Sequence, residues 1–148
     1  MKYNELDDFD AQLHDFTTAT RNVANKSGCE NYQPTLYLID KRGEGTLAVL
    51  PLDDITFTEA VDAYINREYR KIAAVQYLFL AKHSMLEGKP IIYITGYYPD
   101  GKDNASIVHF DDECTTEYFH HDNPGAEDAT VYARIVYECA MNLKADNP

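Results

Sequence analysis

The sequence has no tryptophan, and its 13 Lys plus Arg are outnumbered by 25 Asp plus Glu. The formal net charge of −12 disfavours direct binding to DNA, RNA or anionic lipid, because phosphate recognition needs clustered Lys and Arg. No apolar run reaches the roughly 18 residues that a membrane-spanning helix needs. The acidic N-terminus is unlike a signal or transit peptide. These deficits predict a cytoplasmic protein that binds neither nucleic acid nor membrane.

Cysteine and glycine are also scarce, and their spacing excludes several kinds of site. Cys29, Cys114 and Cys139 match no metal or redox motif, so we expect free thiols in a reducing compartment. Gly43 and Gly45 lack the third glycine and the lysine of a phosphate-binding loop, which favours a plain turn. We therefore expect no cofactor. With 148 residues, the chain is predicted to form a single globular domain over 1–148.

Two apolar runs, residues 72–80 and 91–98, form the predicted centre of the fold, joined through Glu87-Gly88-Lys89-Pro90. The first run is apolar at both odd and even positions, which is typical of an interior strand covered on both faces. Its alternative is a continuation of the preceding helix, because periodicity does not distinguish the two in a short apolar run. Residues 82–87 are interpreted as a wide loop or one helical turn.

Helices are predicted on either side of this centre. An apolar stripe predicts a helix over 5–25, capped by Asn4 and ended by Gly28. Thr56 and Glu59 match a capping box for a helix over 57–70, and Asn123-Pro124 begins a last helix that runs to about residue 144. The predicted buried residues are Leu6, Phe9, Leu13, Phe16 and Val23 in the first helix and Tyr132, Val136, Cys139 and Leu143 in the last.

Strands are predicted over 35–40, 46–50, 105–110 and 115–120 in addition to the two central runs. The fold class is therefore α+β, an antiparallel sheet of about five or six strands flanked by about three helices. The order, α-β-β-α-β-β-β-β-α, resembles that of profilin-like and roadblock-like domains. That resemblance implies an antiparallel sheet flanked by helices and no particular activity.

The densest group of potential metal ligands lies in the predicted hairpin of strands 105–110 and 115–120: His109, Asp111, Asp112, Glu113, Cys114, His120 and His121. If 111–114 is the loop, Ala105 pairs with His120, and His109 shares a face with His120 about 13 Å away at about 3.3 Å per residue. That separation is too long for one zinc ion. Adjacent His120 and His121 point to opposite faces. We expect no metal site, and a small metal-dependent hydrolase centred on 105–121 remains an alternative.

No catalytic motif is recognisable, which favours a non-enzymatic protein. Three carboxylates precede Cys114 and disfavour its thiolate. Acidic residues are too common in this chain for any pair to indicate acid–base catalysis. The cluster Asp7, Asp8, Asp10 and Asp15 suggests an acidic surface. A second alternative is therefore an inhibitor that mimics nucleic acid and binds a basic DNA-binding protein.

Tyrosine, with 12 residues, gives the leading hypothesis. Tyrosine is amphipathic and common at protein interfaces. The predicted interaction residues lie on the two central strands: Tyr77, Tyr93, Tyr97 and Tyr98. The competing interpretation is that they fill the space between the sheet and its helices. We predict a protein-binding or self-associating module, a homodimer by preference. Small acidic chains without recognisable motifs are typical of phage and mobile-element accessory proteins.

Overall fold

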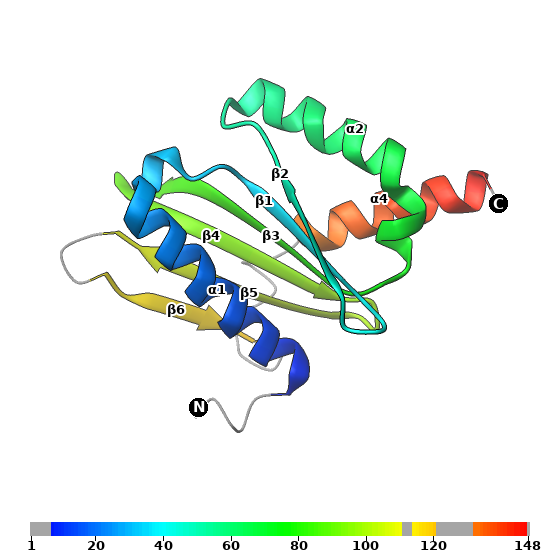
Figure 1. Ribbon diagram of the computed structural model, residues 1–148, viewed down its shortest axis with the longest axis horizontal. Helices are drawn as coiled ribbons and strands as arrows, with labels where there is room; N and C mark the ends of the chain where they lie inside the picture. Colours follow the sequence, from blue (N-terminus) through cyan, green and yellow to red (C-terminus); the bar gives the residue numbers. More distant parts are fainter. Residues whose placement is uncertain (1–6, 111–113, 121–131, 148) are drawn as a thin grey trace.

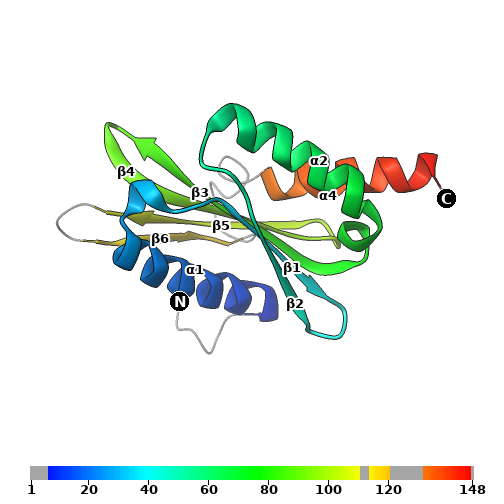
Figure 2. The same ribbon diagram turned by 45° about the horizontal axis from the view of Figure 1, so that its top comes forward.

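A computed structural model describes residues 7–110, 114–120 and 132–147. Within them a single antiparallel sheet has the spatial order β2-β1-β3-β4-β5-β6. Helix α1 covers one face of the sheet, and helices α2 and α4 cover the other (Figures 1 and 2). The elements, in chain order, are α1 (Asp8–Ser27), the short 3-10 helix η2 (Cys29–Asn31), β1 (Thr35–Asp40), β2 (Gly45–Val49), α2 (Asp54–Ala73), β3 (Val75–Leu86), β4 (Lys89–Tyr98), β5 (Lys102–His109), β6 (Thr116–Phe119) and α4 (Tyr132–Asp146).

This arrangement confirms the predicted α+β class and the order α-β-β-α-β-β-β-β-α. Each strand pairs with its neighbours in antiparallel register. None of the helices in the described part of the chain is long and apolar enough to cross a membrane.

The central hairpin, β3 and β4, is longer than the sequence suggested. Helix α2 continues to Ala73, so the strand interpretation is right only from Val75 onward. The wide loop predicted over 82–87 is wrong, because β3 extends to Leu86 and pairs with β4 up to the turn. Glu87 and Gly88 have positive φ angles of 52° and 79°, which suit the tight two-residue turn of a hairpin.

Strand β3 is buried on both faces over residues 77–81, which agrees with the prediction that both faces are covered for part of its length. Phe79 packs with Phe9 of α1 in one core cluster, and Leu78 packs with Ile72 and Val136 in the other. A bulge separates these residues from the start of the strand, since Ile39 pairs with Tyr77 but Asp40 pairs with Val75. The extra residue moves Val75 to the α2 and α4 face, although its odd number matches that of Tyr77 and Phe79.

Helix α1 begins at Asp8 and buries Phe9, Leu13 and Phe16 as predicted, whereas Leu6 lies outside the described residues. Its N-cap is Asp7, whose carboxylate accepts from the Asp10 amide at 2.9 Å; Asn4 lies outside the described residues. Val23, predicted to be buried, is 54% exposed. The helix instead buries positions at spacings of three and four, namely Phe9, Asp10, Leu13, Phe16, Thr17, Thr20 and Ala24. Its end at Gly28 is confirmed.

The caps and faces of the other helices also differ from the prediction. Asp53 caps α2 by accepting from the Thr56 amide at 2.9 Å, so Thr56 lies inside the first turn and is not the cap. Helix α4 buries Val136 as predicted and half-buries Leu143, whereas Tyr132 and Cys139 are exposed and Ala133 and Ala140 point inward instead. The predicted start of this helix, residues 123–131, lies outside the described residues.

Candidate functional site

The four tyrosines predicted to form an interaction face divide between the two faces of the sheet. Tyr77 is 5% exposed and stacks on Phe9 at 5.5 Å between ring centroids, and half-buried Tyr98 meets Tyr77 edge-on at 5.3 Å. Tyr97 is 8% exposed and packs near Tyr137 on the opposite face. Tyr93 is half-buried and lines a pocket with Tyr132 of α4. Tyr77 and Tyr97 thus contribute to the chain's own core, and the interaction role of the four remains a prediction.

The predicted acidic surface is interrupted at Asp10. Asp7, Asp8 and Asp15 are exposed, but Asp10 is 3% exposed. Asn104 of β5 donates its side-chain amide to Asp10 Oδ1 at 3.1 Å, and His120 Nδ1 lies 2.9 Å from the same oxygen. Asp10 is therefore a polar contact between α1 and the β5–β6 side of the sheet rather than a surface charge.

The histidines predicted to share a sheet face lie on opposite faces. Ala105 pairs with Phe119, one residue away from the expected partner, His120. A shift of one residue exchanges the faces of a strand. His120 therefore points toward α1, whereas His109 points away from α1 and contacts Glu117 at 3.2 Å. His121 and residues 111–113 lie outside the described residues, among which no group of three His, Cys, Asp or Glu side chains could hold a metal ion.

Further polar groups surround the Asp10 contact. Thr17 and Ser106 share a hydrogen bond at 2.7 Å, and the His14 ring stacks on Tyr118 at 3.7 Å. Burial, reinforced by nearby His120, lowers the pKa of His14. A carboxylate beside an imidazole can orient a general base. However, Asp10 and His120 are both almost fully buried. The contacts of this group join α1 to the β5–β6 side of the sheet.

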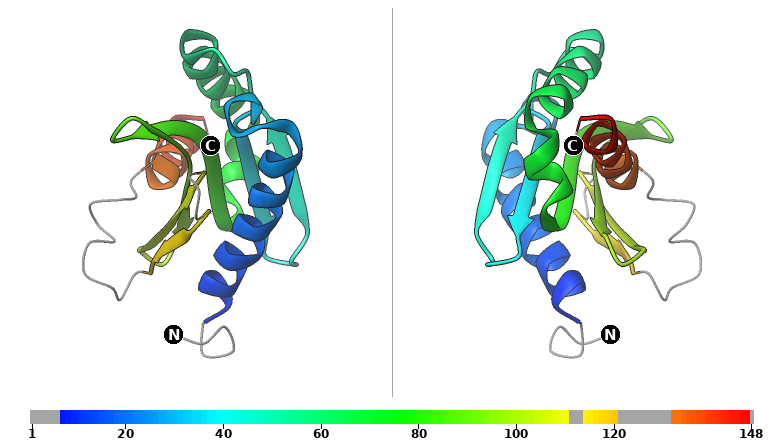
Figure 3. Two further views of the ribbon diagram at one scale, coloured as in Figure 1. Left: turned by 90° about the vertical axis from the view of Figure 1, so that its left-hand side faces the viewer. Right: turned by 90° about the vertical axis from the view of Figure 1, so that its right-hand side faces the viewer.

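Within the described residues, strand β2 is the outermost strand of the sheet on the β1 side, and its outer edge has no neighbouring strand (Figure 3). Its ladder with β1 fixes which backbone groups face outward. The Leu50 amide donates to Pro34 and the Asp40 amide donates to Glu44, so even-numbered residues of β2 bond to β1. The amide and carbonyl groups of Gly45, Leu47 and Val49 consequently point away from the sheet, and no strand among the described residues pairs with them.

The side chains at this edge are apolar and exposed. Leu47 and Val49 are each 61% exposed, and they line a groove of about 440 Å³ between β2 and α1. Val23 of α1, the residue missing from the helix stripe, lies in the same groove. Strand β2 contains neither a charged residue nor a proline, the features that usually protect an edge strand from pairing. The edge and the groove together form our candidate site, which we call the β2 edge.

Comparison with protein-family models, curated proteins and solved structures gives no match to this chain. Sequence reasoning did not single out the β2 edge, although one signal was present. The second strand of the first hairpin is short and uncharged. Val23 gave no signal, because its spacing of seven residues from Phe16 fits the predicted apolar stripe. Which side of that hairpin joins the sheet was not readable from the sequence.

Proposed function

We propose that this protein is a self-associating interaction module in which the β2 edge of one copy pairs antiparallel with the β2 edge of a second copy. The observation that carries this proposal is an unprotected edge strand next to exposed Leu47, Val49 and Val23. Edges of this kind are templates for pairing with another chain. A second copy is the favoured partner because antiparallel pairing of one strand with itself is self-complementary around a two-fold axis.

One register satisfies all of the outward backbone groups. With the two-fold axis at Leu47, Leu47 pairs with Leu47 of the second copy, and Gly45 pairs with Val49 in both directions. These three pairs place outward amides opposite outward carbonyls, as a hydrogen-bonded antiparallel ladder requires. The neighbouring even-numbered residues keep their bonds to β1. The result is a continuous sheet across two copies.

Side-chain sizes fit the same register. A Cβ atom at Gly45 would lie 2.5 Å from the Tyr37 hydroxyl, so the Tyr37 ring covers the glycine. In the dimer, Val49 of the second copy lies opposite Gly45, where it gains an aromatic surface to pack against. Burying a Val or Leu side chain contributes about 1.5–3 kcal/mol. Three residue pairs make a small interface, so we expect dissociation in roughly the micromolar range.

Sedimentation velocity over a hundredfold range of protein concentration tests this proposal. The wild type should change from monomer to dimer, while Leu47→Lys should remain a monomer. The matched control is Leu86→Lys, which charges another exposed leucine, 42% exposed, at the far hairpin. A wild type that stays monomeric at every concentration overturns the proposal, and so does a dimer that Leu86→Lys weakens as much as Leu47→Lys.

Amide hydrogen exchange tests the register separately. The amides of Leu47 and Val49 should exchange quickly in dilute protein and slow down as the dimer forms, whereas those of Thr46 and Ala48 should be protected throughout. Added salt should strengthen the dimer, because it screens repulsion between two chains of charge −12. Binding of an acidic nucleic-acid mimic to a basic partner would weaken with salt instead.

A further inference from the structure

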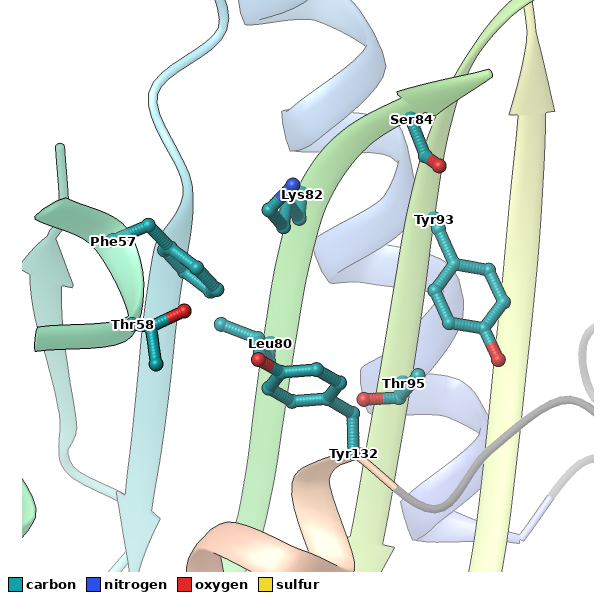
Figure 4. Close-up of a pocket in the computed structure, with 8 residues that line it drawn as sticks. All are labelled: Phe57, Thr58, Leu80, Lys82, Ser84, Tyr93, Thr95 and Tyr132. Atoms are coloured by element: carbon teal, nitrogen blue, oxygen red, sulfur yellow. The ribbon is translucent and has the colours of Figure 1, made fainter. Parts of the chain in front are cut away.

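Helices cover the two faces of the sheet unequally. On one face α2 and α4 lie side by side, and the rings of Phe57 and Tyr132 in their first turns are 6.3 Å apart between centroids (Figure 4). On the other face, α1 is the only long helix among the described residues (Figure 2). The core beneath α1 contains residues of β1, β3, β4, β5 and β6 but none of β2. This face is therefore covered over one part only.

The side chains of β2 show the same difference between the two faces. Ala48 packs against the core on the α2 and α4 face, whereas Leu47 and Val49 on the α1 face are each 61% exposed. Leu47 and Val49 form the floor of the groove described above. Ala19 and Val23 of α1 form its wall, and both are exposed. The groove is thus the part of the α1 face that lacks a covering element.

The uncovered part has the width of one helix. It spans β1 and β2, and two neighbouring strands at about 4.8 Å spacing provide about 10 Å. Helices that pack together lie about 8–10 Å apart between their axes. A helix laid over β1 and β2 would therefore contact α1 along one side and rest on Leu47 and Val49. An extended segment would leave most of this width empty.

The charges of the chain determine the sign of a suitable helix. None of the eleven residues that line the groove is a lysine or an arginine, and the chain carries a net charge of −12. An acidic segment is repelled by that charge, whereas a basic segment is attracted to it.

We propose that the groove docks an amphipathic helix of a partner protein, with the apolar side of the helix on Leu47, Val49 and Val23 and its Lys and Arg residues toward solvent. A helix that lays its apolar side into a hydrophobic groove is a common mode of peptide recognition. Docking does not need the proposed dimer. The helix would lie on the face of the sheet, whereas a second copy pairs with the strand edge in the plane of the sheet.

Tryptophan fluorescence tests the proposal, because the protein itself has no tryptophan. The probe is a peptide of about 18 residues, long enough to form a helix, with leucines and one tryptophan on one side and lysines on the other. Its emission should move to shorter wavelength and saturate as protein is added at constant ionic strength. A scrambled peptide keeps the composition and charge but has no apolar side, and a third peptide has glutamate in place of lysine. Both should bind at least about tenfold more weakly, the factor that 1.4 kcal/mol represents.

Val23→Asn removes apolar surface from the wall of the groove without adding charge, and it lies outside the β2 ladder. It should weaken the amphipathic peptide at least about tenfold and leave sedimentation of the protein unchanged. Ile135→Asn is the matched control, because Ile135 is an aliphatic residue of α4 with a similar exposed fraction, 49% against 54% for Val23. It should change neither measurement.

Equal binding of the amphipathic and scrambled peptides, or an unchanged affinity in Val23→Asn, would overturn the proposal. If Val23→Asn does not fold, the three peptides on the wild type still decide. A wild type that dimerises but does not bind the peptide contradicts docking alone. A wild type that binds the peptide but stays monomeric contradicts the proposed dimer alone.

Discussion

Replacing Asp10 by alanine distinguishes the predicted role of this residue, a charge on an acidic surface, from the buried contact that the structure shows. A carboxylate on an acidic surface could be removed at little cost, whereas the structure places Asp10 against Asn104 and His120 at 3.1 and 2.9 Å. Removing it leaves a buried amide and a buried imidazole without that acceptor. Breaking a buried charged contact by deleting one partner costs about 3–5 kcal/mol. The higher helix propensity of alanine returns about 0.7 kcal/mol at most.

We therefore expect Asp10→Ala to lower the free energy of unfolding by about 3 kcal/mol, a large share of the roughly 5–15 kcal/mol typical of a domain. Urea denaturation at pH 7 measures this change. Asp8→Ala is the matched control, because it brings the same gain in propensity in the same turn but removes an exposed carboxylate. Its cost should stay below about 1 kcal/mol, the size of a helix-dipole contribution.

A double-mutant cycle with His120→Ala then isolates the contact itself. The losses in free energy of unfolding of the two single variants should add up to about 1 kcal/mol or more above the loss in the double variant, because the effects of substituting two residues in contact are not additive. If Asp10→Ala costs no more than Asp8→Ala, the carboxylate belongs to the surface and the packing of α1 described above is refuted.

Two further predictions use titratable groups. Burial is the main cause of the lowered pKa of His14, followed by nearby His120, while Asp10 and Asp15 act in the opposite direction. Because the pKa is lower in the folded protein, the unfolded chain binds the proton more readily than the folded one. The stability of the wild type relative to His14→Phe should therefore fall as pH drops below about 6.5, as urea titrations at pH 7.5 and 5.5 would show, and a constant difference would contradict it. Burial raises the pKa of Cys29 to about 11, so a thiol reagent at pH 8 should label the two exposed cysteines in the native protein and Cys29 only after unfolding; three equal rates would contradict this.

The order of elements was predictable because long apolar runs define it. Residues 77–81 are apolar at both odd and even positions, so their burial on both faces follows from the sequence whatever covers each face. Where α2 ended was not predictable, because Ile72 and Ala73 suit a helix or a strand equally. Packing beside α4 decided in favour of the helix, and Ile72 is fully buried there.

The spacing of residues along α1 predicted the burial of Asp10, but its polar side chain kept it out of the predicted apolar stripe. Residues 10, 13, 17, 20 and 24 follow the three-and-four spacing of one helix face, and all five are buried. Three of them are polar, so a search for apolar side chains chose Val23 instead. Their partners are visible only in the fold: Asn104 and Ser106 of β5 lie about ninety residues away in the chain and meet Asp10 and Thr17.

The register of β5 and β6 shows how a small error changes a candidate site. The expected four-residue loop paired Ala105 with His120, and the structure pairs it with Phe119. Nothing in the sequence fixes the register of these two strands to within one residue. It nonetheless determines that His120 meets Asp10 inside the core while His109 meets Glu117 outside it. Ligand geometry across a hairpin is thus predictable only when the register is known.

The two edges of the sheet explain why we assign self-association to one of them. Strand β6 carries Glu117 in its centre, and a charge at that position opposes pairing with another chain. The same side of the sheet is fixed to α1 by the Asp10, Asn104 and His120 contacts. The β2 edge has neither feature: its strand is uncharged, and its outward amides lie beside exposed Leu47 and Val49. A second copy that paired through β6 would have to accommodate two carboxylates, whereas pairing through β2 buries apolar surface on both copies.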